Sequence, residues 1–316
     1  EMLRLLRQRV VDNGQWYIFI DLASKYGVVP KSVMPDTQCS PDTRYVTRTL
    51  GDKLRLSIKQ LRDDYAMHHS IERLEALREE QLEGVYGILC RFLGIPPTVF
   101  TFEFRDRKGQ WHCLENITPQ EFFRSYGGVN PDDYMFVIHH PSAKRPFLQT
   151  YYIEDYTHKP PQRPCPAILL NADLPMIKQA VIAQLKAGEQ VVMGCDVAKQ
   201  SHKQIGLMDA QLYPYEELFG TELNMSKADR ILYKGTCGTH IMSFSGVNLR
   251  PDGTPDRWKI QNSYGMSMGI SGHYVMSDSW FDEYVLSVVV RKDLAPAALR
   301  EAYEKEPQAM SMSEWY

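Results

Sequence analysis

The sequence predicts an α+β fold in which a largely helical part is followed by an antiparallel β half-barrel. Residues 52–93 carry apolar side chains at helical spacing. After residue 190 the pattern changes to several short apolar strands separated by turns with glycine and proline. Between these parts, residues 141–166 contain six prolines, which indicates an irregular segment at a subdomain boundary.

Composition limits the classes of function. The 316 residues are 43% apolar and 24% charged, and the formal net charge is -3, which is typical of a globular protein with no electrostatic reason to bind nucleic acid or anionic lipid. No run of about 18 apolar residues predicts a membrane span, and the first residues lack the features of a signal peptide. We therefore expect a cytoplasmic protein without a membrane or nucleic-acid partner.

The cysteines do not form a recognisable cluster. The six are Cys39, Cys90, Cys113, Cys165, Cys195 and Cys237. They contain no Cys-x-x-Cys pair and no Cys/His group at metal-ligand spacing, so we expect mostly structural, reduced thiols and neither a metal nor another cofactor.

Local signals place the elements of the first part. A helix is expected over residues 16–26, with Gly27 as its left-handed cap. Residues 68–70 are expected to divide the long helical run in two, and residues 98–105 alternate as a strand does. Pro119 follows Thr118 at the predicted start of a further helix.

The second part is predicted to be mainly strands. Asp173 is expected to cap a helix that ends near Gly188. The strand candidates are residues 190–197, 240–249, 257–262, 272–276 and 285–291.

Two of these strands carry residues with a known chemistry. His240 opens one strand and Asn262 closes the next, and a turn at residues 251–253 would bring the two side chains together. An imidazole can take the proton of a thiol and stabilise the thiolate. An amide that accepts from the other ring N–H fixes the tautomer of that imidazole. Spacing alone is weak support, because a strand histidine is usually structural and Asn-Ser-x-Gly is usually a turn.

Longer segments make the assignment specific. They are residues 12–16, 25–35, 103–106, 129–134, 194–197, 225–230 and 276–285. In these segments, and over nearly its whole length, the chain resembles the bleomycin hydrolase and aminopeptidase C family of papain-like cysteine peptidases. The resemblance implies an incomplete papain-like fold with a helical insertion, and peptide-bond hydrolysis by a thiol aminopeptidase.

The resemblance also implies roles for individual residues. His240 corresponds to the general base and Asn262 to the residue that orients it. Thr239 would offer its backbone carbonyl near the scissile bond. Asn13 and Gly14 lie where paired glycines of the family let the substrate backbone approach.

The chain departs from the family pattern around the same site. The family's oxyanion Gln and Cys-Trp segment lies several dozen residues before the motif at residues 12–16, so the cysteine-bearing portion is expected to be absent from this chain. Cys195 corresponds to a scaffold strand and not to a nucleophile. Tyr264 replaces a tryptophan that shields the His–Asn pair from water, and Tyr264 would be a less complete shield. The family's terminal motif is not found in residues 310–316.

The resemblance implies a division into subdomains. Residues 1–30 would be the remnant of the nucleophile lobe, residues 31–165 a helical insertion, residues 166–295 the β lobe with His240 and Asn262, and residues 296–316 the tail.

Two functions remain open at this point. The chain is part of an active thiol aminopeptidase whose cysteine is supplied from elsewhere, with peptides as substrates. Alternatively, it is an inactive peptidase homologue that serves as a structural or interaction subunit. In either case we expect a homo-oligomer or other chains to cover the missing lobe, because loss of the nucleophile helix would expose apolar surface.

Overall fold

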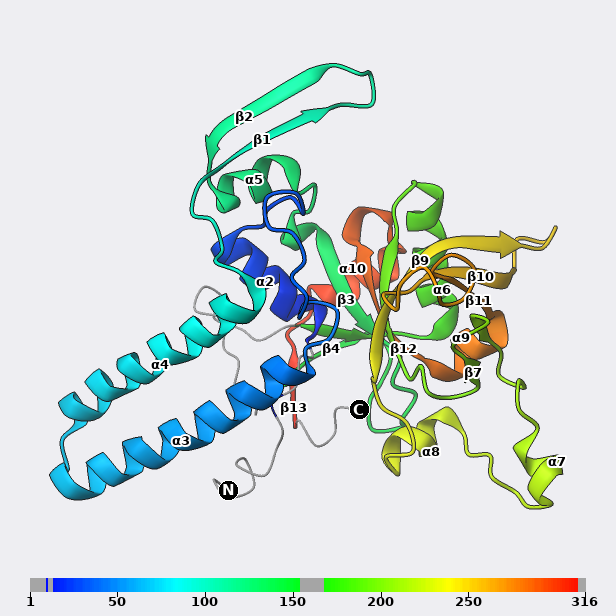
Figure 1. Ribbon diagram of the computed structural model, residues 1–316. Coiled ribbons are helices and arrows are strands. Elements are labelled where there is room, and N and C mark those ends of the chain that lie inside the picture. Colours follow the sequence, from blue (N-terminus) through cyan, green and yellow to red (C-terminus); the bar gives the residue numbers. More distant parts are fainter. Residues whose placement is uncertain (1–9, 11–13, 154–167, 312–316) are drawn as a thin grey trace. The chain divides into compact units, whose positions relative to one another are not determined.

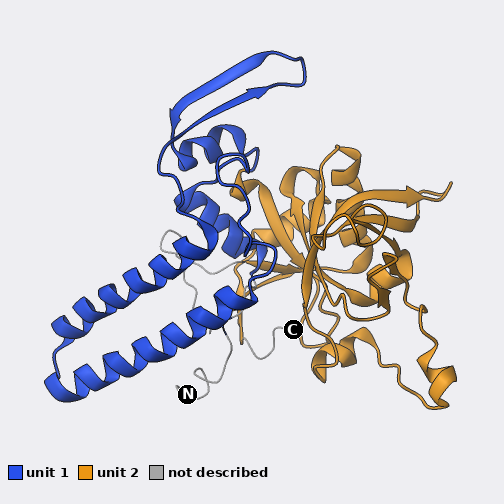
Figure 2. Cartoon of the chain, viewed as in Figure 1, with its two compact units in different colours: residues 1–129 blue, residues 130–316 orange. Residues whose placement is uncertain are grey.

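The computed structural model describes residue 10 and residues 14–153 and 168–311 (Figure 1). The chain forms two compact units, residues 1–129 and residues 130–316 (Figure 2). The boundary predicted at residues 165/166 thus lies inside the second unit, because strands on both sides of it join one sheet. The finer subdomain limits stay predictions.

The first unit combines long helices with a small hairpin. Its elements are α2 (Trp16–Tyr26), α3 (Arg44–His68), α4 (Ile71–Leu93), β1 (Phe100–Arg105), β2 (Trp111–Ile117) and α5 (Pro119–Tyr126). The expected break in the helical run is confirmed, because His69 adopts a left-handed conformation and Ser70 caps α4 through the Arg73 amide. As a result α3 and α4 form an antiparallel helical hairpin (Figure 1).

The end of α2 fits closely against the start of α5. Gly27 has a φ of 77° and a ψ of -172°, a region that is essentially restricted to glycine. The amide of Val28 donates to the carbonyl of Pro119 at 3.2 Å. A Cβ on Gly27 would lie 2.0 Å from the carbonyl carbon of Pro119. Gly27 ends α2 at the predicted position, but its ψ of -172° is extended and not that of the left-handed helical cap expected from the sequence, because the chain turns here to meet Pro119.

The second unit contains a large sheet. Its elements are η1 (Pro131–Asp133), β3 (Tyr134–Ile138), β4 (Gln149–Ile153), β5 (Leu169–Asn171), α6 (Leu174–Lys186), β6 (Val191–Cys195), β7 (Ser201–His202), β8 (Leu207–Met208), α7 (Tyr215–Phe219), α8 (Lys227–Leu232), β9 (His240–Leu249), β10 (Pro255–Gln261), β11 (His273–Ser277), α9 (Asp278–Tyr284), β12 (Val285–Arg291), η2 (Lys292–Leu294), α10 (Ala297–Tyr303) and β13 (Gln308–Met310).

The sheet has 11 strands in the order β13-β4-β5-β3-β12-β6-β9-β10-β11-β8-β7. The prediction of an antiparallel half-barrel is wrong in part, because the sheet is mixed. The pairs β3/β5, β4/β13 and β8/β11 are parallel. The segment expected to be irregular also contains the strand β4, which lies between prolines and is too short to show a periodic pattern.

The core of the second unit lies between this sheet and two helices. Helix α6 packs on β12 and β9, and α9 packs on β10 and β11. Phe244, Trp258 and Phe281 are buried with their rings in mutual contact. The indole N–H of Trp258 donates to the Asp278 carboxylate at 3.1 Å. This packing fixes β9 and β10, the two strands that bring His240 and Asn262 together.

Candidate active site

The structure brings His240 and Asn262 into direct contact. His240 is the first residue of β9, and Asn262 directly follows β10, its antiparallel neighbour. The turn between the strands includes Gly253 with a φ of 84°, a value that favours glycine. The Nε2 of His240 lies 2.9 Å from the Oδ1 of Asn262.

The amide of Asn262 defines the tautomer of the imidazole. Its Oδ1 also accepts a hydrogen bond from the backbone N–H of Ser263 at 2.7 Å, so this oxygen is an acceptor on two sides. Nε2 of His240 therefore carries the donated proton, and Nδ1 keeps its lone pair. An imidazole in this tautomer can take a proton from a thiol that approaches Nδ1.

Tyr264 lies on the imidazole ring. The ring centroids of Tyr264 and His240 are 4.7 Å apart and the planes differ by 19°. The ammonium of Lys203 lies 5.3 Å from the Tyr264 centroid. Burial raises the pKa of Tyr264, although the residue is still 36% exposed. The ring thus covers one face of His240 and leaves the site partly open to water.

A buried carboxylate holds the backbone just before His240. The Oδ2 of Asp196 accepts from the Thr236 hydroxyl at 2.8 Å, and its Oδ1 accepts from the Thr239 hydroxyl at 3.4 Å. The amide of Thr239 donates to the carbonyl of Cys195 at 2.9 Å. The hydroxyl of Thr239 accepts from the amide of Val197 at 3.1 Å. These bonds tie the residue before the imidazole to the end of β6.

The contributions of Asp196 and Thr236 were not predicted from the sequence. The carboxylate and its threonine partner are 40 residues apart, and no local spacing signals such a pair. Asp196 did lie in a segment shared with the family, but that segment assigned it no role.

The described cysteines do not place a thiol on the imidazole. Cys195 is fully buried, and its Sγ donates to the backbone carbonyl of His240 at 3.7 Å. Burial strongly raises the pKa of the Cys195 thiol, which makes it inert. Cys237 is exposed. Within residues 14–153 and 168–311, no cysteine sulfur hydrogen-bonds to the ring of His240.

The structure does not test the expected role of Asn13 and Gly14 in substrate binding. Asn13 lies outside the described residues. Gly14 is exposed, and a Cβ placed on it would meet nothing within 4 Å. Both belong to the first unit, so their approach to substrate stays a prediction.

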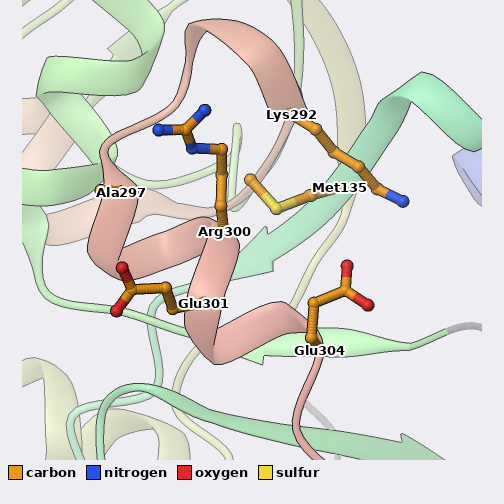
Figure 3. Close-up of a pocket in the computed structure, with 6 residues that line it drawn as sticks. All are labelled: Met135, Lys292, Ala297, Arg300, Glu301 and Glu304. Atoms are coloured by element: carbon orange, nitrogen blue, oxygen red, sulfur yellow. The ribbon is translucent and has the colours of Figure 1, made fainter.

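The second unit also has hollows away from the histidine. One of about 390 Å³ lies beside α10, where Figure 3 shows its lining residues Met135, Lys292, Ala297, Arg300, Glu301 and Glu304. An open groove of about 780 Å³ lies along β9, β10 and β11. His240 and Asn262 line neither of them. The described residues contain no group of three or more His, Cys, Asp or Glu side chains that could hold a metal ion, and no helix among them is long and apolar enough to cross a membrane.

Comparison with known proteins places this geometry in a family. The chain aligns with the crystal structure of PepW from Lactobacillus rhamnosis HN001 with a TM-score of 0.90 and 38% identity, over 99% of this chain and 70% of that one. It is 37% identical over 303 residues to aminopeptidase C of Streptococcus thermophilus (95% of this chain, 67% of that protein). It is 32% identical over 309 residues to bleomycin hydrolase of Gallus gallus (96% of this chain, 67% of that protein).

The likeness to PepW shows that the chain has a papain-like peptidase fold. A model of the Peptidase C1-like family matches residues 1–315. The chain therefore belongs to the Peptidase C1-like family, and the family resemblance seen in the sequence is confirmed. It spans about two thirds of the length of the curated relatives that it matches.

Proposed function

We propose that this chain supplies the general base and the orienting amide of a thiol aminopeptidase, and that a cysteine outside the chain supplies the nucleophile. The observation that carries the proposal is the 2.9 Å hydrogen bond between His240 and Asn262. Membership of the Peptidase C1-like family supports peptides as the substrate class.

The chemistry follows from the tautomer. Nδ1 of His240 takes the proton of the incoming thiol, which then attacks the peptide carbonyl and forms an acyl-thioester. The resulting imidazolium returns this proton to the leaving amine, and a water molecule, deprotonated by the same imidazole, hydrolyses the thioester. Asn262 keeps the ring oriented through both steps. Thr239 would accept from the substrate backbone through its carbonyl.

The alternative is an inactive homologue that serves as an interaction subunit. It is favoured by the changes around the site, where Tyr264 leaves the imidazole partly open. It is also favoured by exposed apolar side chains that a partner would cover. These are Phe19, Leu22 and Tyr26 on α2, and Leu218, Phe219 and Tyr233 on or beside α7 and α8. Under both functions we propose that the chain associates with further copies or with other chains.

Hydrolysis of fluorogenic aminoacyl amides tests the two functions. The substrates are offered to the 316-residue chain and to the same chain extended to its natural start. We expect hydrolysis by the extended protein alone, sensitive to a thiol alkylator and abolished by His240→Gln.

Asn248→Ala, a substitution on the same strand, is the matched control and leaves the rate unchanged. An extended protein that folds, retains the His–Asn pair and hydrolyses nothing would favour the inactive homologue.

A further inference from the structure

Two buried polar atoms beside the His–Asn pair lack a complete hydrogen-bond set. They are the Nδ2 of Asn262 and the phenol oxygen of Tyr274. Among the residues that the structure describes, neither atom meets a partner at hydrogen-bonding geometry. Buried polar groups in folded proteins are nearly always satisfied, so two adjacent exceptions call for an explanation.

The strand register puts these groups on the same side of the sheet. Tyr274 in β11 is directly opposite Ile260 in β10, and both side chains are fully buried. Asn262 lies two residues after Ile260. Its backbone N–H donates to the Gly272 carbonyl at 3.1 Å and so continues the strand pairing. Because side chains alternate along a strand, Asn262 projects toward the same face as Tyr274.

The strand order indicates how the side-chain amide of Asn262 faces the phenol, because β10 lies between β9, which begins with His240, and β11, which carries Tyr274. Burial raises the pKa of Tyr274, and the side-chain amide of Asn262 opposes this shift. Oδ1 of Asn262 is already turned to His240 and Ser263. The donor side of the amide is therefore the side that faces the phenol oxygen.

We propose that Tyr274 is a positioning residue that accepts a hydrogen bond from Nδ2 of Asn262 and thereby keeps Oδ1 of Asn262 on the His240 ring. This inference rests on the proposed function for its catalytic meaning and adds a third residue to the His–Asn pair. A small shift of either side chain lets the phenol oxygen satisfy the buried amide nitrogen, and it does so only while Oδ1 points to Nε2. A rotated amide would place its N–H groups against Nε2 and favour the tautomer with the proton on Nδ1, which cannot accept a thiol proton.

The test uses the imidazole tautomer rather than hydrolysis. Histidine ring nitrogens are labelled with ¹⁵N in the full 316-residue chain, and the His240 signals are assigned with His240→Gln. The ¹⁵N shifts report which nitrogen carries the proton. We expect the Nε2–H tautomer in the parent chain. In Tyr274→Phe the Nδ1–H population should rise by at least about fivefold, the lower end of the effect of leaving a buried donor unsatisfied.

Tyr151→Phe is the matched control. Tyr151 is equally buried, and its phenol oxygen also lacks a partner at hydrogen-bonding geometry among the described residues, but it lies on β4. A merely structural role of the phenol would lower stability in both variants and leave the His240 tautomer unchanged. Tyr274→Phe in an Asn262→Ala background should give no further change in tautomer, because the amide that links the two rings is gone.

An unchanged tautomer in folded Tyr274→Phe would overturn the inference. If Tyr274→Phe does not fold, a measurement on the parent chain tests the inference instead. A nuclear Overhauser contact between the Asn262 amide protons and the Tyr274 ring is then expected, and its absence overturns the inference. The outcome does not depend on hydrolysis: a tautomer change in a chain that stays inactive with its upstream extension supports the role of Tyr274 and contradicts the proposed function.

Discussion

Asp196 holds the segment before His240 with both of its carboxylate oxygens. Its Oδ2 receives the Thr236 hydroxyl and its Oδ1 receives the Thr239 hydroxyl. Asp196→Ala leaves the buried Thr236 hydroxyl without its acceptor, whereas the exposed Thr239 hydroxyl keeps the Cys195 carbonyl at 3.4 Å. We therefore expect the free energy of unfolding to fall by about 1–3 kcal/mol. Urea unfolding measures this loss.

Asp196→Asn is the control for this prediction, because its amide oxygen still accepts one of the two hydroxyls. Its loss should be clearly smaller than that of the alanine variant. Equal losses in the two variants would show that the hydroxyl contacts do not matter.

His139 makes stability depend on pH. Burial, followed by the charge of Lys227, lowers the pKa of His139 from 6.5 to about 3. Between pH 6.5 and about 3, the His139 ring is therefore protonated in the unfolded chain and neutral in the folded chain. The free energy of unfolding falls as the pH falls through this range. Between pH 6.5 and about 5, the free energy of unfolding should drop by about 1.5 kcal/mol from this group.

Urea unfolding at the two pH values tests this dependence on the parent chain and on His139→Gln. The variant lacks the titrating ring, so its pH slope should be shallower by that amount. Parallel slopes would exclude His139 as the source.

Residues joined through a hairpin could be predicted, and residues joined across the sheet could not. His240 and Asn262 are linked by two adjacent strands and one turn, so their closeness was expected from strand period and turn residues, while their roles came from the family resemblance. The place of Tyr264 on the imidazole was implied by the family resemblance, in which it replaces a shielding tryptophan. Asp196 meets Thr236 only because β6 pairs with β9, and such pairings leave no local pattern in a sequence.

At the level of elements, the junction of α2 and α5 depends on one glycine. Gly27 combines a conformation that other residues avoid with a close approach to Pro119. Gly27→Ala should therefore destabilise the first unit by about 3 kcal/mol or more, the sum of backbone strain and steric overlap. Trp16 fluorescence during urea unfolding follows the loss.

Gly109→Ala separates the two causes. Gly109 also has a positive φ, of 80°, but a Cβ there meets nothing within 4 Å. Gly109→Ala should therefore lower the free energy of unfolding by only about 1 kcal/mol, which is the backbone strain alone. A Gly27 variant no worse than this one would refute the steric argument.

Helices were easier to predict than strand order. The helix limits at residues 16–26 and the break near residue 69 follow from caps and periodicity, which are local. Parallel pairs such as β3/β5 arise from segments far apart in the chain, and the strand β4 lies within a proline-rich stretch. Antiparallel neighbours were expected everywhere because only hairpins carry a sequence signal.

On the scale of the whole molecule, the described residues contain the His240–Asn262 pair and no cysteine sulfur that hydrogen-bonds to its imidazole. The buried Cys195 cannot serve, because its pKa is raised and its Sγ faces a backbone carbonyl. We propose that His240 and Asn262 are set to activate a cysteine that this chain receives from elsewhere.

The rate of thiol alkylation at about pH 5.5 tests that claim most directly, because a free thiol of pKa about 8.5 hardly reacts there. The measurement uses the chain extended to its natural start, with the modified cysteine located by mass spectrometry. We predict one rapidly alkylated cysteine outside residues 1–316, slowed by at least about 100-fold in His240→Gln. Equal rates in the parent and in this variant, or no such cysteine, would contradict the account.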